Sequence, residues 1–357
     1  MESKQNRKPK TQLPSPSRPE SIAMDDAPLR ISVIVPMRNE AETITACLRS
    51  LLSQTIPAAE CEVIVVDGSS NDGCKEVVRN LETSAPNLRL LSNPDRIMPV
   101  GMNIGLGKAR APVIMVAGAH TTYPPDYLRK CLFYLQQTGA AVVGGPLVTM
   151  PRAPGFAGRI IAAILSSRFG VGNASFRTTL KEGFVDTVPY GAYRKEIFAV
   201  CGQYNEALIR AQDWELHARI RQAGGRIYQT PELLTYYYPV ATFRELWRKA
   251  FFDGLWQILA VRENPQSLAL RRLAPTFMLM LLAMLATGAL FTLWPRILLY
   301  MFLGLYILAG VCFGPHQSPA FDILTRLSLP VLAFPFHLSY GLGTLAGLCQ
   351  MKTRHAH

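Results

Sequence analysis

The 357-residue chain lacks the cysteine patterns that mark a disulfide framework or a zinc site. Its seven cysteines are scattered and odd in number, with no C-x-x-C pair, which favours reduced thiols in a cytosol-facing domain. Residues 1–28 lack the apolar core of a secretory signal and predict a disordered basic tail. The chain also lacks helix-turn-helix, zinc-finger and RNP-like patterns. Nucleic acid is therefore not expected as a partner, despite a formal net charge of +12.

Charged residues are scarce at 17%, whereas hydrophobic residues make up 49% of the chain. This balance is more apolar than that of a typical soluble domain and predicts that part of the chain lies in lipid. We expect a helical transmembrane region over residues 271–357. Its three hydrophobic segments are 274–294, 297–313 and 327–349.

The arrangement of these segments predicts how the chain lies in the membrane. We expect a tight turn at Pro295-Arg296. The third segment contains Pro330 and Pro335 and is either a span or a re-entrant segment. Arginines before the first segment and the basic N-terminal half place the large N-terminal domain on the cytoplasmic side. The expected location is the cell (inner) membrane, with several spans.

The N-terminal part begins with a strand, helix and strand. The β-branched run Ile31–Val35 closes at Pro36, apolar residues then recur at helical spacing, and a second apolar run covers Val63–Val66. This order predicts a βαβ unit with a parallel pair. Ligands of such sheets bind beyond the carboxyl ends of the strands. Polar residues stand there, namely Asn39, Glu40 and Asp67.

The segments P-M-R-N-E after the first strand and D-G-S-S-N-D-G after the second resemble the opening of family 2 glycosyltransferases. The branch is similar to bacterial enzymes of succinoglycan and other exopolysaccharides, and the resemblance covers roughly residues 31–238. It implies an α/β domain of GT-A fold, with a Rossmann-like mixed sheet, over residues 29–240. It also implies a nucleotide-sugar donor, expected to be a UDP-sugar. Glu40 would grip the ribose side and Asp67 the uracil ring, with Pro36 and Asn39 beside them and Asp72 nearby.

The same resemblance implies a helix beside the donor site that opens with Asn103 and ends at Ala109. Its glycines lack the Gly-Lys-Ser/Thr ending of a phosphate loop and are expected to let the helix pack closely on the sheet. The strand 112–117 then ends in Gly118-Ala119-His120. The family carries a carboxylate at the first of these positions, which helps to hold a divalent cation, Mg²⁺ or Mn²⁺. Gly118 replaces that carboxylate. His120 is left as the expected metal ligand, or as a histidine hydrogen-bonded at a strand end.

A second match lies at residues 184–228. There the family implies that Gly191 lines the donor sugar pocket and that Gln212-Asp213 opens a helix. Asp213 would be the catalytic base and Gln212 a donor contact; the alternative for Asp213 is plain N-capping. A carboxylate at a helix N-terminus is stabilised as an anion, which predicts a low pKa for Asp213. Glu206 is a possible second acidic contact.

Residues 241–270 alternate aromatic and basic residues at helical spacing, which predicts an amphipathic segment in a membrane interface. Arg248 or Lys249 either meets a phosphate group or belongs to a solvated basic face. The Gln-x-x-Arg-Trp motif of processive family members is absent, which favours the transfer of single sugars over polymerisation.

Together these features predict a membrane-anchored inverting glycosyltransferase. The acceptor would be a lipid-linked saccharide or glycan, in exopolysaccharide or cell-surface glycan synthesis. Gly118 prompts an alternative, a catalytically impaired nucleotide-binding scaffold of a glycan assembly complex. An NAD-type Rossmann enzyme ranks far behind, because the first strand is followed by Pro-Met-Arg-Asn-Glu and not by G-x-G-x-x-G.

Overall fold

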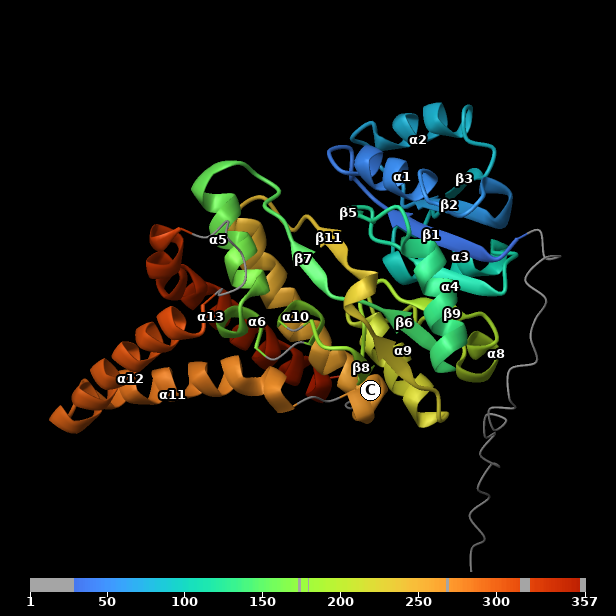
Figure 1. Ribbon diagram of the computed structural model, residues 1–357. Helices are drawn as coiled ribbons and strands as arrows, with labels where there is room; N and C mark the ends of the chain where they lie inside the picture. The colour runs from blue at the N-terminus through green and yellow to red at the C-terminus, as the bar shows by residue number, and fades with distance from the viewer. Residues whose placement is uncertain (1–28, 173–174, 179, 268–269, 315–321, 354–357) are drawn as a thin grey trace, which may run out of the picture.

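The computed structural model describes residues 29–172, 175–178, 180–267, 270–314 and 322–353. The expected disordered tail at residues 1–28 lies outside the described residues. Figure 1 shows two parts, an α/β unit whose sheet runs from β1 to β10 and a helical region formed mainly by the last third of the chain. A hairpin of two helices, α11 and α12, projects from the helical region (Figure 1).

The predicted βαβ unit is present at the start of the α/β unit. Strand β1 (Ile31–Met37), helix α1 (Ile44–Leu52) and strand β2 (Cys61–Asp67) follow one another. Strands β1 and β2 pair in parallel from Ile31 with Cys61 to Met37 with Asp67. The two strand ends therefore lie side by side, which confirms the predicted edge.

Within the described residues, eight strands form a mixed sheet of order β3-β2-β1-β4-β9-β6-β10-β8. The strands β1 to β4 run parallel, whereas β9 pairs antiparallel with both β4 and β6. The added strands are β3 (Leu88–Ser92), β4 (Val113–Val116), β6 (Val142–Gly144), β8 (Gly183–Val185), β9 (Ala192–Arg194) and β10 (Ile227–Gln229).

Helices cover both faces of this sheet because alternate strand residues point to opposite sides. Val33 and Val35 of β1 face a core shared with α1, α2 and α4, while Ile34 between them faces a core shared with α3, α8 and α9. The helices are α2 (Cys74–Glu82), α3 (Met98–Lys108), α4 (Tyr127–Thr138), α8 (Ile197–Cys201) and α9 (Gln212–Gln222).

Helix α3 begins at Met98, five residues before the expected start at Asn103, and has Pro99 in its first turn. A Cβ placed on Gly105 would collide with the side chain of Ile34 on β1. The expected close packing of this helix on the sheet is confirmed.

A small sheet links the α/β unit to the helical region. Its order is β5-β11-β7, formed by β5 (Thr121–Thr122), β7 (Leu147–Thr149) and β11 (Thr235–Tyr237). Helices α5 (Gly155–Ser166), α6 (Arg168–Val171) and α7 (Ser175–Thr178) follow β7. Short 3-10 helices lie at Ala58–Glu60, Pro231–Leu233, Pro265–Ser267 and Leu270–Leu273.

Helix α10 (Phe243–Glu263) begins with a capping box between Thr242 and Glu245. Its residues Leu246 and Ala250 are fully buried in a core shared with α5 and α13 (Ile323–Thr353). The apolar face that we expected at a membrane interface is therefore covered by protein.

The other two helices differ from the expected spans in where they begin and end. Helix α11 covers Ala274–Gly288 and helix α12 covers Leu293–Cys312. The turn therefore lies at residues 289–292, and Pro295 belongs to the first turn of α12. Pro330 and Pro335 lie inside the single helix α13.

Helices α12 and α13 are long and apolar enough to cross a membrane. Only 6% of the apolar window of α12 is buried in the protein, against 39% for α13. Large apolar side chains of α11 and α12 face outward, among them Phe277, Met284 and Met301. The hairpin thus presents an apolar surface.

Candidate functional site

A cavity of about 1230 Å³ opens at the carboxyl ends of β1, β2 and β4 and extends into the helical region. At the sheet, its lining includes most of the predicted site residues, namely Pro36, Glu40, His120, Gly191, Gln212 and Asp213. In the helical region it is lined by Phe169, Met278, Tyr306, Phe336 and others. The strand tips and the predicted base therefore share one cavity.

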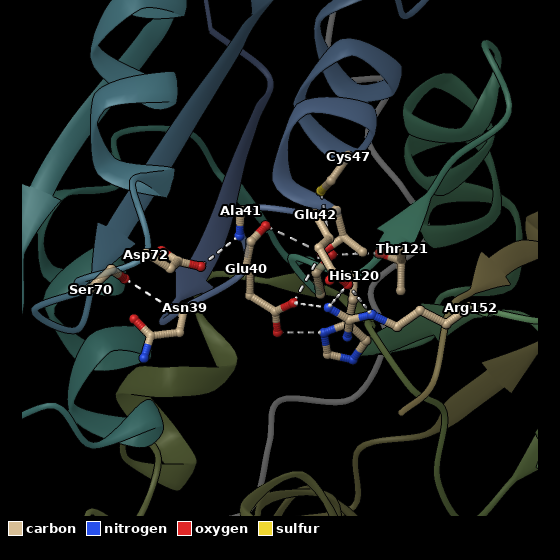
Figure 2. Close-up of polar contacts among 12 residues, drawn as sticks. Asn39, Glu40, Ala41, Glu42, Cys47, Ser70, Asp72, His120, Thr121 and Arg152 are labelled. Carbon is tan, nitrogen blue, oxygen red and sulfur yellow. Dashed lines mark hydrogen bonds and ion pairs between the residues drawn. The ribbon is translucent and has the colours of Figure 1, made fainter. Parts of the chain in front are cut away.

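Hydrogen bonds between the loops after β1 and β2 shape this end of the cavity (Figure 2). The Asn39 N–H donates to the Ser70 hydroxyl at 3.0 Å, and the Asn39 side-chain oxygen accepts from the Asn71 N–H at 3.0 Å. The Asp72 carboxylate accepts from the Ala41 N–H at 2.8 Å. Asn39 is not among the cavity-lining residues, so it and Asp72 position the loops.

Several residues with strained backbone conformations lie at or next to the cavity wall. The described non-glycine residues with positive φ are Asn39, Ser69, Arg96, Tyr190 and Ala211. Arg96, Tyr190 and Ala211 line the cavity, and the other two are adjacent to residues that do. Such conformations persist where the surroundings enforce them, and they cluster at functional sites.

Asp67 lies at the tip of β2 and is 1% exposed. One of its oxygens accepts from the Ser70 N–H at 3.1 Å, whereas the other is buried and finds no partner among the described residues. Asp67 itself is not among the cavity-lining residues, whereas its neighbours Val66 and Gly68 are. A buried carboxylate oxygen without a donor is costly, which makes this oxygen a candidate for contact with a ligand N–H.

Glu40 and His120 face each other across the cavity edge (Figure 2). The His120 Nδ1 donates to Glu40 Oε1 at 3.1 Å, while Glu40 Oε2 accepts from the Thr43 hydroxyl at 2.9 Å and lies 3.7 Å from Arg152. Burial alone would raise the pKa of Glu40. The His120, Thr43 and Arg152 contacts outweigh burial and hold that pKa below its usual value.

Helix α9 begins at Gln212, as predicted, after Ala211 in a left-handed conformation. The Trp214 N–H donates to the Asp213 carboxylate at 2.9 Å. The predicted low pKa of Asp213 is wrong: burial raises it above its usual value, although the Trp214 N–H and the Arg272 charge act in the opposite direction. A raised pKa makes Asp213 a stronger base than an ordinary aspartate.

Asn103 does not lie in the cavity lining. Its side chain accepts from the Tyr204 N–H at 3.0 Å and donates to Glu206 at 2.8 Å. Glu206, the possible second acidic contact, is exposed and engaged there. The pair holds the chain that leads to Asp213, which is a positioning role.

The residues around His120 do not fit the expected cation. Mg²⁺ and Mn²⁺ prefer carboxylate oxygens, and Gly118 supplies none, while both oxygens of Glu40 already have partners. Among the described residues, no group of three or more His, Cys, Asp or Glu side chains could hold a metal ion. The role of His120 as a metal ligand stays a prediction, and the reaction is derived from the side chains alone.

The lining is rich in cations, most of which the sequence did not single out. It holds seven arginines and one lysine against two aspartates and one glutamate. Among them, Arg177 lies over the Tyr237 ring at 5.1 Å, and Arg152 lies beside Glu40. Arg152 and Arg177 come from segments with no recognisable motif, so no sequence signal pointed to these two.

Residues 32–201 match the family model described as Glycosyl transferase family 2. The succinoglycan biosynthesis protein ExoA of Rhizobium meliloti is 29% identical over 262 residues, which cover 72% of this chain and 77% of that protein. A protein of Methanococcus voltae is 25% identical over 89% of this chain and 97% of its own length. It is named dolichyl N-acetyl-alpha-D-glucosaminyl phosphate 3-beta-D-2,3-diacetamido-2,3-dideoxy-beta-D-glucuronosyltransferase.

Among solved structures, the mannosyltransferase PcManGT from Pyrobaculum calidifontis, in complex with GDP-Man and Mn²⁺, superposes with a TM-score of 0.61. The match covers 94% of this chain and 90% of that one at 20% identity. At this identity the likeness shows a shared fold, the mixed α/β sheet of GT-A enzymes.

Proposed function

We propose that this chain, whose residues 32–201 match the family 2 glycosyltransferases, is a membrane-anchored, inverting enzyme of that family. It transfers one sugar from a nucleotide-sugar, a UDP-sugar, to a lipid-linked saccharide acceptor. The observation that carries this proposal is the single cavity in which the strand tips, Asp213 and an apolar helical end meet.

The donor assignment is supported by Asp67 at the tip of β2. Its buried oxygen without a described partner suits a base that presents an N–H, such as the imide of uracil. Glu40 lies on the same edge and is kept ionised by its neighbours, which suits a contact with ribose hydroxyls.

The chemical step follows from the place of Asp213. The acceptor hydroxyl attacks the anomeric carbon from the side opposite the diphosphate while Asp213 takes its proton. One such displacement inverts the configuration. A positioned general base contributes about 10²–10⁴-fold to a rate. The unpartnered buried oxygen of Gln212, next to Asp213, suits a hydrogen bond from a sugar hydroxyl.

The acceptor assignment is supported by the helical end of the cavity. An apolar lipid chain would fit against the side chains of Phe169, Met278, Tyr306 and Phe336 there. The phosphate of such a lipid would fit beside Lys249 and Arg272, which line the same cavity. The outward-facing apolar side chains of α11 and α12 suit a bilayer. The Methanococcus voltae relative is named for a dolichyl phosphate-linked acceptor, which agrees with this class.

The proposed location is the cell (inner) membrane, with several membrane segments and the α/β unit on the cytoplasmic side, where nucleotide-sugars are made. The name of the Rhizobium meliloti relative supports a role in exopolysaccharide or cell-surface glycan synthesis. Sugar addition in single steps remains part of this proposal.

The test is a panel of nucleotide-sugars with a polyprenyl-linked acceptor, run on the full chain in detergent with Asp213→Asn in parallel. We expect one donor to release nucleoside diphosphate, and the variant to lose about 10²–10⁴-fold in kcat with UDP affinity within about twofold. A variant that kept most of the wild-type kcat would show that Asp213 is not the base.

A further inference from the structure

Gly118 stands where the family carries a carboxylate, and the structure shows what fills the space. A Cβ placed on Gly118 would lie 2.7 Å from Cε1, Cζ and Oη of Tyr190. Carbon atoms in van der Waals contact stand about 3.5–4.0 Å apart, so an aspartate at position 118 and the Tyr190 ring exclude each other. Tyr190 thus occupies the place of the missing carboxylate side chain.

The backbone of both residues is in a defined conformation. The Gly118 N–H donates to the Tyr123 hydroxyl at 3.1 Å, and its carbonyl accepts from the Thr121 hydroxyl at 2.6 Å. Tyr190 has a φ of 48°, a left-handed conformation that bulky residues rarely adopt. A strained tyrosine that is held against a fixed glycine indicates a built feature at the cavity wall.

Cationic side chains lie near the contact between Gly118 and Tyr190. The Arg177 guanidinium lies 5.1 Å from the centre of the Tyr237 ring, whose other neighbour is the His120 ring at 5.3 Å. The Arg152 guanidinium lies 3.2 Å from the Glu42 carboxylate and 3.7 Å from the Glu40 carboxylate. All of these side chains except Glu42 line the cavity. Two guanidinium groups would repel a divalent cation here, whereas they match the geometry and charge of phosphate oxygens.

We propose that Arg152 and Arg177 offset the charge of the leaving nucleoside diphosphate in this enzyme, in place of a divalent cation, and that the Tyr190 hydroxyl donates a hydrogen bond to it. The inference rests on the proposed glycosyl transfer. The bond from the anomeric carbon to the β-phosphate oxygen breaks and leaves its electron pair on that oxygen. The acceptor oxygen bonds the same carbon and its proton goes to Asp213. The diphosphate gains one negative charge, which the arginines offset.

Tyr190 fits the role of a neutral hydrogen-bond donor. Burial raises its pKa well above the usual value, so the hydroxyl is protonated at neutral pH. A donor that keeps its proton can stabilise charge on the departing oxygen without becoming an anion itself.

The first test measures UDP binding to the full chain by calorimetry, with GDP as a second probe, in EDTA and in Mn²⁺. We expect wild-type UDP affinity to agree within about threefold between the two conditions. Arg177→Gln should bind UDP about tenfold more weakly in EDTA. The matched control is Arg79→Gln, on the exposed face of α2, which should bind like the wild type. Loss of wild-type UDP binding on chelation would overturn the inference.

The second test exchanges the two side chains. Gly118→Asp alone should lower the melting temperature, and adding Tyr190→Ala should restore it, because the ring no longer occupies the space. UDP binding by the double variant should become cation-dependent, while Tyr190→Ala alone stays cation-independent. A stable Gly118→Asp protein with wild-type UDP binding would refute the steric argument.

These outcomes separate the inference from the proposed function. Binding of UDP or GDP only with a cation would overturn the arginine role and leave sugar transfer standing. Failure of both nucleotides to bind under both conditions would overturn the nucleotide-sugar function itself.

Discussion

The two ends of the cavity are built by opposite means. At the sheet, polar side chains are held by hydrogen bonds to neighbouring loops, and residues with strained backbone stand close together. In the helical region, the wall includes the aromatic and aliphatic side chains of Phe169, Met278, Tyr306 and Phe336. A rigid polar end suits a ligand of fixed shape, whereas an apolar end suits a flexible chain that needs no fixed partners.

The junction between these ends is the start of α9. Asp213 stands there, with the strained Ala211 before it and Trp214 after it, and Arg272 lies over the Trp214 ring at 3.5 Å. Arg272 belongs to the segment that enters the helical region. The proposed base therefore lies where, in our proposal, a donor from one end meets an acceptor from the other.

The largest effect is expected from a substitution that disrupts only the polar end of the cavity. Asp67→Asn replaces the carboxylate with an amide that cannot offer a charged acceptor to a nucleobase. We expect about 10–100-fold weaker UDP binding, because hydrogen bonds to charged groups contribute about 1.5–3 kcal/mol. Calorimetry with the surface variant Asp126→Asn as a control measures it. Wild-type affinity in Asp67→Asn would mean that the β2 tip does not hold the base.

The next largest effect is expected from substitutions that disrupt only the apolar, helical region. Phe277 and Met284 on α11 are each 64% exposed, and their replacement by Asp places charges on the hairpin surface. We expect sedimentation with lipid vesicles to fall about tenfold or more, with UDP affinity unchanged. Phe133→Asp, at a site on α4 that is 55% exposed, is the matched control. Unchanged vesicle binding in the double variant would remove the hairpin from the membrane account.

A smaller effect concerns the chain that leads to the junction. Asn103→Ala removes the hydrogen bonds to Tyr204 and Glu206. We expect kcat to fall about threefold to tenfold, since each such bond is worth about 0.5–1.5 kcal/mol, with UDP affinity preserved. Steady-state kinetics with calorimetry measures this. A selective loss of UDP binding would instead make Asn103 a donor contact.

The smallest effect is a shift in the pH profile. Asp213 acts as a base only when ionised, and its raised pKa means that activity is lost, as the pH falls, at a higher pH than for an ordinary aspartate. Arg272 lowers that pKa, so Arg272→Met should move the acid limb of kcat/KM to higher pH. Arg248→Met, which removes a similar cation stacked on Phe252, should leave the limb in place. An acid limb that did not move in Arg272→Met would contradict the assignment.

The parts of the molecule that the sequence predicted are those with a local signal. The β1 and β2 tips follow runs of β-branched residues, and Gln212 opens its helix within a few residues of a recognisable motif. The starts of α3 and α12 carry a local signal as well, because proline favours the first turn of a helix and both have one there.

The remaining features depend on contacts between distant segments. Tyr190 meets Gly118 only after β4 and β9 pair, and no pattern in either segment indicates it. The pKa of Asp213 was misjudged for a similar reason. Its helix N-terminus is visible in the sequence, but its burial arises only in the folded chain, where α9 packs against α10.

The most direct test of the central claim is the anomeric configuration of the product. The full chain would be incubated with its α-linked UDP-sugar and a lipid-linked acceptor, and the reaction followed by proton NMR. The coupling constant of the new anomeric proton reports the configuration of the product. A single displacement assisted by Asp213 predicts a β-linked product. An α-linked product would contradict an account in which one base and one leaving group face each other across this cavity.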